Sequence, residues 1–93
     1  MDEKTKMLIL KQDLQMLTSA NDDYLRHLLE LAEEAIQCEG IRETDSIEYE
    51  GAQIQYAAYL FRKRAGLETT MPRYLRWGLN NILLSQKAKK NDV

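Results

Sequence analysis

Apolar residues recur at helical spacing in four separate stretches of this chain, and this pattern constrains the fold more than any other feature. Residues three and four positions apart share one face of a helix, so each stretch predicts a helix with one buried side. The chain contains one proline and four glycines, which argues against many tight turns. No strand-like alternation and no internal repeat interrupts the pattern. We therefore expect an all-α fold, a small compact bundle of about four helices in a single domain spanning residues 1–93.

The expected helices occupy approximately residues 7–17, 22–38, 46–64 and 72–86, with one longer loop before the last. Asn21 or Asp22 can cap the second helix, because their side chains accept hydrogen bonds from its free N–H groups. Asp45, with Glu48 three residues later, indicates the start of the third helix in a variant of the capping box. Pro72 suits the start of the fourth helix, where its missing N–H costs nothing.

The apolar stripe of each expected helix identifies the candidate core. The stripes are Met7, Leu10, Leu14 and Leu17; Leu25, Leu28, Leu29, Ala32 and Ile36; Ile47 and Ile54; and Leu75, Leu79, Ile82 and Leu83. Gly40 and Gly66 are placed to end the second and third helices. The charged segment 87–93 is expected to fray.

Two further apolar surfaces are not explained by these stripes. The run from Tyr56 to Phe61 is apolar on every side of its helix, and such a helix is buried on more than one face. In a domain this small, another subunit can cover the second face. Trp77 and Leu84 lie seven residues apart and form a second apolar strip on the last helix. These surfaces are candidates for contacts between chains.

Charge is divided unequally between the two halves of the chain. Residues 1–50 carry thirteen acidic and five basic residues, a net charge of −8, whereas residues 51–93 carry eight basic and two acidic residues, a net charge of +6. Such a molecule can attract copies of itself head to tail, and contacts of this kind close into rings when the rotation allows. The basic half alone could instead hold a polyanion.

The residues give little indication of catalysis. His27 and Cys38 lie eleven residues apart on one expected helix, about 16 Å, which is too far for them to act together. The glycines are scattered singly, so no phosphate-binding loop is present, and no histidine or cysteine cluster has metal-ligand spacing. We expect no enzymatic activity and no catalytic, metal or cofactor site. The start of the chain lacks the order of a signal peptide, and no apolar run is long enough to cross a bilayer, so we expect an intracellular protein with no membrane partner.

The basic half also has features of a nucleic-acid surface. Arg73, Arg76 and Asn80 stand at helical spacing, and arginine and asparagine on a helix can contact phosphates and bases. A helix-turn-helix needs a short turn, however, and about seven residues separate the last two expected helices here. Pairing of this basic face with acidic groups on another subunit is the favoured alternative.

The residues also resemble a known family. The stretch Tyr56–Arg64, the following loop, Met71–Arg76 and the ending Leu79–Asn81 are similar to the head–tail connector (adaptor) proteins of tailed phages and prophages, also labelled DNA-packaging proteins. The start of the second helix at Asp22–Leu25 agrees with this pattern. The resemblance implies a small helical structural protein without a catalytic site, which forms a ring beneath the portal and continues the DNA channel.

The resemblance implies as partners other copies of the chain, the phage portal protein and a tail or head-completion protein, with DNA passing through the channel without sequence-specific binding. It places the protein in the host cytoplasm during assembly and then in the virion neck. The chain stops soon after Lys87, so a longer arm for portal docking is expected to be reduced. Two alternatives stay open: a small helical DNA-binding protein acting in genome packaging, and a host-directed interaction module.

The expected contact surface combines the aromatic anchors with the basic cluster. Its residues are Tyr56, Tyr59, Arg62, Arg64, Arg73, Tyr74, Arg76, Trp77, Asn80, Asn81 and Leu84.

Overall fold

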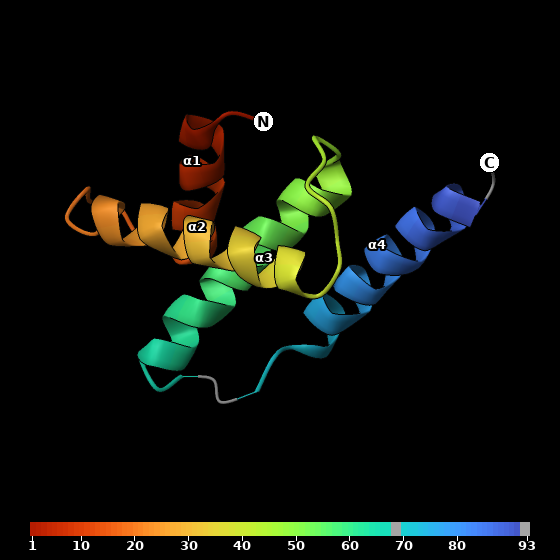
Figure 1. Ribbon diagram of the computed structural model, residues 1–93. Helices are drawn as coiled ribbons and strands as arrows, with labels where there is room; N and C mark the ends of the chain where they lie inside the picture. The colour runs from red at the N-terminus through yellow and green to blue at the C-terminus, as the bar shows by residue number, and fades with distance from the viewer. Residues whose placement is uncertain (68–69, 92–93) are drawn as a thin grey trace.

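The computed structural model of the chain describes residues 1–67 and 70–91, with side chains in the last helix described as far as residue 88. It contains four α-helices: α1 (Glu3–Asp13), α2 (Asp22–Cys38), α3 (Ile47–Arg64) and α4 (Arg73–Asn91). No strand occurs among the described residues. The structure confirms the predicted all-α class, the four helices and the loop before the last one (Figure 1).

Helix α3 is the centre of the fold, because it contacts each of the other three helices. On one side it packs against α1 and α2, and on the other against α4 (Figure 1). Two apolar clusters result. The first contains Met7, Leu10, Leu25, Leu28, Leu29, Ala32, Ile54, Ala57 and Ala58, and the second contains Ile36, Ile41, Tyr49, Ala52, Tyr59, Leu75 and Leu79.

Helix α2 has the predicted bounds, and all five residues of its apolar stripe are buried. Asn21 occupies the cap position, although its side chain accepts no capping hydrogen bond. Gly40 follows the helix with a φ of 93°, a left-handed conformation that glycine adopts without steric cost. Gly66 has a φ of 79° after α3, so both predicted glycine stops are confirmed.

Helix α1 lies further towards the N-terminus than predicted. Asp2 caps it by accepting a 2.7 Å hydrogen bond from the Thr5 N–H, and the helix ends at Asp13 instead of Leu17. Gln15 adopts a φ of 59°, and the Met16 N–H reaches back to the Lys11 carbonyl at 2.8 Å. This geometry is a Schellman stop built without glycine, which the sequence does not signal. Leu17 is consequently 97% exposed, and its predicted place in the core is wrong.

Helix α3 and its cap each start one residue later than predicted. The cap is Ser46, whose hydroxyl accepts a 3.2 Å hydrogen bond from the Tyr49 N–H, so the predicted capping box of Asp45 and Glu48 is wrong. The Thr44 hydroxyl lies 2.8 Å from that of Ser46 and holds the cap in place. Ile47 follows the cap on the outer side of the helix and is 80% exposed, so it lies outside the predicted core.

Helix α4 starts directly after Pro72, whose carbonyl accepts a hydrogen bond from the Arg76 N–H at 3.2 Å. It continues to Asn91, five residues beyond the predicted end. The backbone from Lys87 to Asn91, where the sequence predicts fraying, is helical, and residues 92–93 lie outside the described part of the chain.

Helix α4 is held to the connector between α2 and α3 by polar contacts. Arg76 forms a bidentate pair with Glu39, at 2.7 and 3.1 Å. One turn from the described end of the helix, the Gln86 side chain accepts a hydrogen bond from the Arg42 N–H at 2.8 Å and donates one to the Arg42 carbonyl at 2.9 Å. These contacts fix the direction of α4 relative to α3.

Candidate functional site

The all-apolar half of α3 is covered within the chain. Tyr59 is only 7% exposed and belongs to the cluster that contains Leu75 and Leu79 of α4. Tyr56 is half-buried, packs edge to face with Tyr59 at 6.0 Å between ring centroids, and has a pKa raised by burial. The face that we expected another subunit to cover is therefore occupied by α4. Tyr59 thus lies in the core and the half-buried Tyr56 packs against it, whereas a contact surface was predicted for both.

Three arginines of the expected contact surface are engaged inside the chain. Arg62 donates to the Asp13 carboxylate at 3.4 Å and to the Asp13 carbonyl at 3.2 Å, which joins α3 to the end of α1. The guanidinium of Arg64 lies over the Tyr24 ring, 5.7 Å from its centroid. The Glu39 carboxylate raises the pKa of Arg76 by its hydrogen bonds. These side chains therefore contribute to intramolecular contacts.

The remaining expected residues lie together on the solvent side of α4. Tyr74, Trp77 and Leu84 are exposed and share one side of the helix, because they stand at offsets of 0, 3 and 10. Trp77 and Leu84 are each 64% exposed. We call these three residues the outer strip. Asn81 lies on the same side of the helix, between Trp77 and Leu84, and the exposed Arg73 and Asn80 flank the strip. The second apolar strip predicted on this helix is confirmed as a surface.

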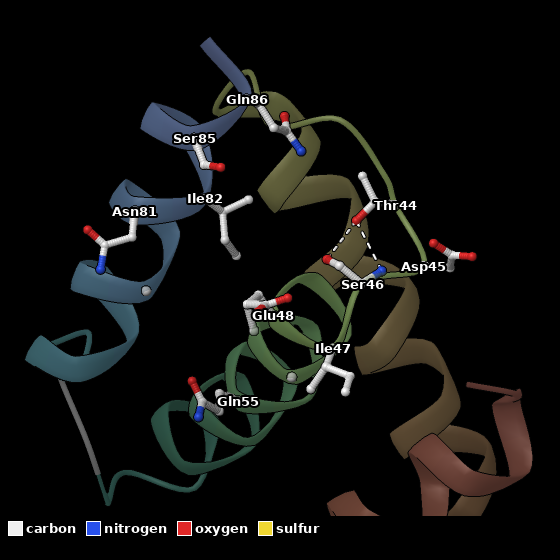
Figure 2. Close-up of a pocket in the computed structure, with 13 residues that line it drawn as sticks. Thr44, Asp45, Ser46, Ile47, Glu48, Gln55, Asn81, Ile82, Ser85 and Gln86 are labelled. Carbon is white, nitrogen blue, oxygen red and sulfur yellow. Dashed lines mark hydrogen bonds between the residues drawn. The ribbon is translucent and has the colours of Figure 1, made fainter. Parts of the chain in front are cut away.

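A groove runs beside the outer strip, between the first half of α3 and the middle of α4. Its volume is about 820 Å³. Its lining residues include Gly51 and Ala52 from α3 and Gly78 and Ile82 from α4, with the exposed Ile47 at one end. Figure 2 shows Ile82 and Glu48 directed into the space between the two helices. We call this feature the α3–α4 groove.

The α3–α4 groove has an acidic character. Asp45 and Glu48 lie along it, and no lysine or arginine does so among the residues that the structure describes. Gln55, Asn81 and Ser85 supply neutral polar groups at its edges. The groove was not predicted from the sequence, because its walls come from two segments far apart in the chain. The signals of the groove that the sequence offered were the isolated glycines inside two helices.

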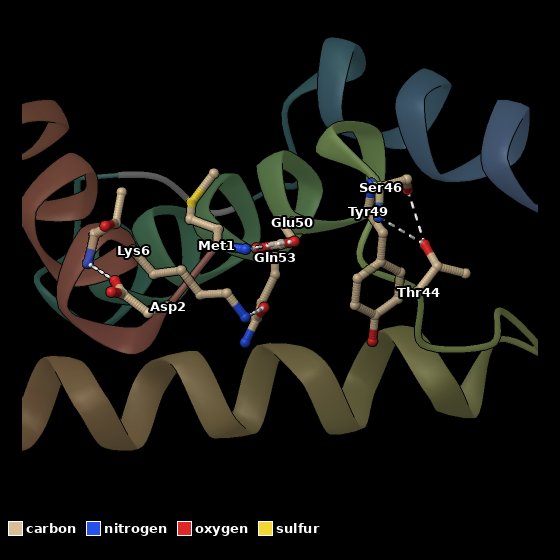
Figure 3. Close-up of polar contacts among 9 residues, drawn as sticks. Met1, Asp2, Lys6, Thr44, Ser46, Tyr49, Glu50 and Gln53 are labelled. Atoms are coloured by element: carbon tan, nitrogen blue, oxygen red, sulfur yellow. Dashed lines mark hydrogen bonds and ion pairs between the residues drawn. The ribbon is translucent and has the colours of Figure 1, made fainter.

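Buried polar side chains lie on the other side of α3, between α1 and α2. Lys6 Nζ donates to Gln53 Oε1 at 2.8 Å, and Gln53 Nε2 donates to the Leu29 carbonyl at 3.0 Å. The amino-terminal ammonium of Met1 lies 3.1 Å from the buried carboxylate of Glu50 (Figure 3). These contacts join three helices through hydrogen bonds and one ion pair. Their geometry is that of structural support.

The same region contains two groups with shifted pKa values. Burial is the main cause that raises the pKa of the Glu33 carboxyl, and hydrogen bonding to Glu43 is the second. Burial also raises the pKa of Tyr49, whose hydroxyl has no hydrogen-bond partner within the described residues. Among all the residues that the structure describes, no group of three or more histidine, cysteine, aspartate or glutamate side chains is arranged to hold a metal ion. His27 and Cys38 are exposed on α2.

The two surfaces that adjoin on α4, the outer strip and the α3–α4 groove, are thus the candidate site. Both are suited to contact with a macromolecule, since one is a projecting aromatic face and the other an open cleft. Among the described residues, no helix has the length and apolarity that a membrane span needs. No protein-family model, no curated protein and no solved structure matches this chain.

Proposed function

We propose that this chain is a structural assembly protein without enzymatic activity, whose copies join head to tail in a ring of the phage head–tail connector type. The ring would join the portal to the tail or head-completion protein, with DNA passing through its channel. The observation that carries the proposal is the outer strip of α4. Tyr74, Trp77 and Leu84 remain exposed on a helix whose opposite side already packs in the core.

Physical arguments support an assembly role for this strip. Tryptophan and tyrosine are the residue types that most often anchor protein–protein interfaces, because they bury large areas at low cost in side-chain entropy. A ring requires a heterologous interface with two different patches on each copy. The net charges of −8 and +6 in the two halves of the sequence favour pairing of unlike patches.

The intramolecular contacts of the basic half bear on the alternative of DNA binding. Arg62 and Arg76 are paired with carboxylates, and Arg64 stacks on a tyrosine. Phosphate binding gains most from cations that release counterions on contact, and these pairings reduce that gain. A channel wall along which DNA slides needs weak contacts of this kind.

Native mass spectrometry tests the proposal. The purified chain would be measured over a range of concentration and salt, with and without duplex DNA. A closed ring whose mass is unchanged by DNA supports the connector function. A monomer or dimer that takes up DNA, with affinity falling steeply as salt rises, contradicts it and favours a packaging protein that binds DNA. If the chain stays monomeric and ignores DNA, co-purification with the portal protein decides whether the ring forms on that template.

A further inference from the structure

We propose that the α3–α4 groove of one copy receives the outer strip of α4 from a second copy, with Trp77 seated over Gly51 and Gly78. This inference rests on the proposed function, because it names the two patches by which copies would join head to tail. Three features of the described residues carry it: the two glycines, the distribution of charge, and the arrangement of both patches on one helix.

Gly51 and Gly78 lie inside helices where glycine is unfavourable. An interior glycine costs about 0.5–1 kcal/mol relative to alanine, because the unfolded chain loses more freedom on folding. Packing within the chain does not require either glycine, since a Cβ atom built at each position meets nothing within 4 Å. Both positions nevertheless line the same groove, one from each wall. Close approach of an outside group to the helix backbone explains this pairing, and a large flat ring can lie against the two positions that lack a side chain.

The charges of the two patches are complementary. Asp45 and Glu48 lie along the groove. Arg73 and Lys87 are exposed beside the outer strip, fourteen residues apart, and no ion pair links either to another described residue. At 1.5 Å per residue, the two cations span about 21 Å of helix. A copy that lays this helix face along the groove can bring a cation to the acidic end while the apolar strip covers the floor.

A second copy is the occupant that the geometry favours. The strip and the groove adjoin on the same helix, where Asn81 belongs to both. Within one copy, the outer side of α4 cannot reach the groove, because the same helix forms one wall of that groove. Trp77 is accordingly exposed within its own chain. Each copy thus carries one donor strip and one acceptor groove. Such a pair of patches can extend from copy to copy.

Two single variants remove the patches separately. Trp77→Ala deletes the proposed anchor, and Gly51→Leu fills the groove at a position where an added Cβ atom meets nothing within 4 Å in the monomer. Each is expected to weaken association by about 30-fold or more, the effect of losing an interface hot spot. Matched controls are Leu8→Ala, an exposed leucine on α1, and Gln12→Leu, an added leucine on the same helix. The controls should associate like wild type, and circular dichroism checks that all variants keep their helices.

Mixing the two defective variants gives the decisive measurement. The Gly51→Leu copy keeps its strip and the Trp77→Ala copy keeps its groove, so a mixture should form a one-to-one heterodimer that cannot extend. Analytical ultracentrifugation of each variant and of the mixture gives the masses. Monomeric single variants with a dimeric mixture support the proposed contact.

The other outcomes separate the two proposals. If the wild type assembles and either single variant assembles equally well, the contact is overturned while head-to-tail assembly stands. If both variants are monomeric and the mixture is too, the contact is also overturned. If the wild type stops at a dimer and the mixture still pairs, the contact holds and the ring is contradicted. A wild type that stays monomeric at all concentrations overturns the self-contact proposed here.

Discussion

At the scale of single residues, Gln53 shows how this small domain satisfies a polar side chain in its interior. It is buried on α3, yet it accepts from Lys6 of α1 and donates to the Leu29 carbonyl of α2. One side chain therefore links three helices. Burial of an amide is tolerated only when its hydrogen bonds are made, so this position is sensitive to change.

We expect Gln53→Ala to lower the free energy of unfolding by about 1–3 kcal/mol, because it removes both hydrogen bonds and leaves a gap at a buried site. Urea denaturation followed by circular dichroism measures the change. Gln55→Ala is the matched control, since Gln55 is exposed on the same helix two positions later. Its effect should lie within about 0.5 kcal/mol of zero. Equal effects of the two variants would show that the Gln53 hydrogen bonds contribute nothing.

A second residue-scale feature is the carboxyl of Glu33. Burial and Glu43 raise its pKa above the ordinary value of 4.5, with smaller effects from Lys6, which lowers it, and Glu30, which raises it. The folded chain therefore holds this proton more tightly than the unfolded chain does. The resulting stabilisation is complete below about pH 4.5 and is lost as the pH rises through the folded-state pKa.

Glu33→Gln should abolish this loss, because the amide carries no charge at any pH. Relative to wild type, the variant is expected to gain stability at pH 7 and to show less gain, or none, at pH 4. Denaturant unfolding at both pH values gives the difference, and Glu34→Gln, at the exposed neighbouring position, controls for the general effect of removing an acid. A Glu33→Gln variant with the same stability difference from wild type at both pH values would contradict the shift.

At the scale of helices, the clearest contrast is between two Schellman stops with the same hydrogen bonds. After α3, Gly66 takes the left-handed position, and the Leu67 N–H bonds to the Arg62 carbonyl at 2.8 Å. After α1, Gln15 takes that position. A residue with a Cβ is strained there, so the stop of α1 carries a cost that the stop of α3 avoids.

Gln15→Gly is expected to raise the free energy of unfolding by about 0.5–1 kcal/mol, because relief of this strain exceeds the added entropy of the unfolded chain. The reverse change, Gly66→Ala, should lower it by a similar amount. Thermal and urea denaturation measure both. A destabilised Gln15→Gly variant would show that Gln15 makes favourable contacts that outweigh the strain.

This contrast also explains which helix boundaries were predictable. Signals carried by one residue type, such as Gly40 and Gly66, placed the ends of α2 and α3 correctly. The end of α1 depends on a left-handed glutamine, which has no signature in the sequence. The predicted cap of α3 was wrong for a different reason. Asp45 and Ser46 are adjacent, and both residue types are good caps. Only the backbone path, with Thr44 beside Ser46, selects between them.

The candidate site was predictable where it depended on one helix and not where it depended on packing between helices. The spacing of Trp77 and Leu84 predicted an apolar strip, and both are exposed. The apolar run around Tyr59 was predicted to be covered by another subunit, and this was wrong because α4 covers it. The sequence does not show that α4 folds back onto α3. The α3–α4 groove arises from the same packing. It required the structure, although Gly51 and Gly78 were visible as isolated glycines throughout.

At the scale of the whole molecule, charge and apolar area act on assembly in different ways. Exposed ion pairs at a protein surface contribute roughly 0–1 kcal/mol each and are screened by salt, with a Debye length of about 10 Å at 0.1 M. Burial of an aromatic anchor contributes more and is little affected by moderate salt. The division of charge should therefore favour the right pairing of patches, while the outer strip of α4 supplies most of the affinity.

We expect a rise from about 0.05 to 0.5 M sodium chloride to weaken self-association gradually, by about tenfold or less, and Trp77→Ala to weaken it more than Arg73→Gln does. Sedimentation equilibrium at several salt concentrations measures the three proteins side by side. Sulfate distinguishes the contributions further, because it screens charge but strengthens burial of apolar surface. Association that is insensitive to sodium chloride would contradict electrostatic pairing of the two halves. A larger loss with Arg73→Gln than with Trp77→Ala would mean that charge, and not the outer strip, holds the copies together.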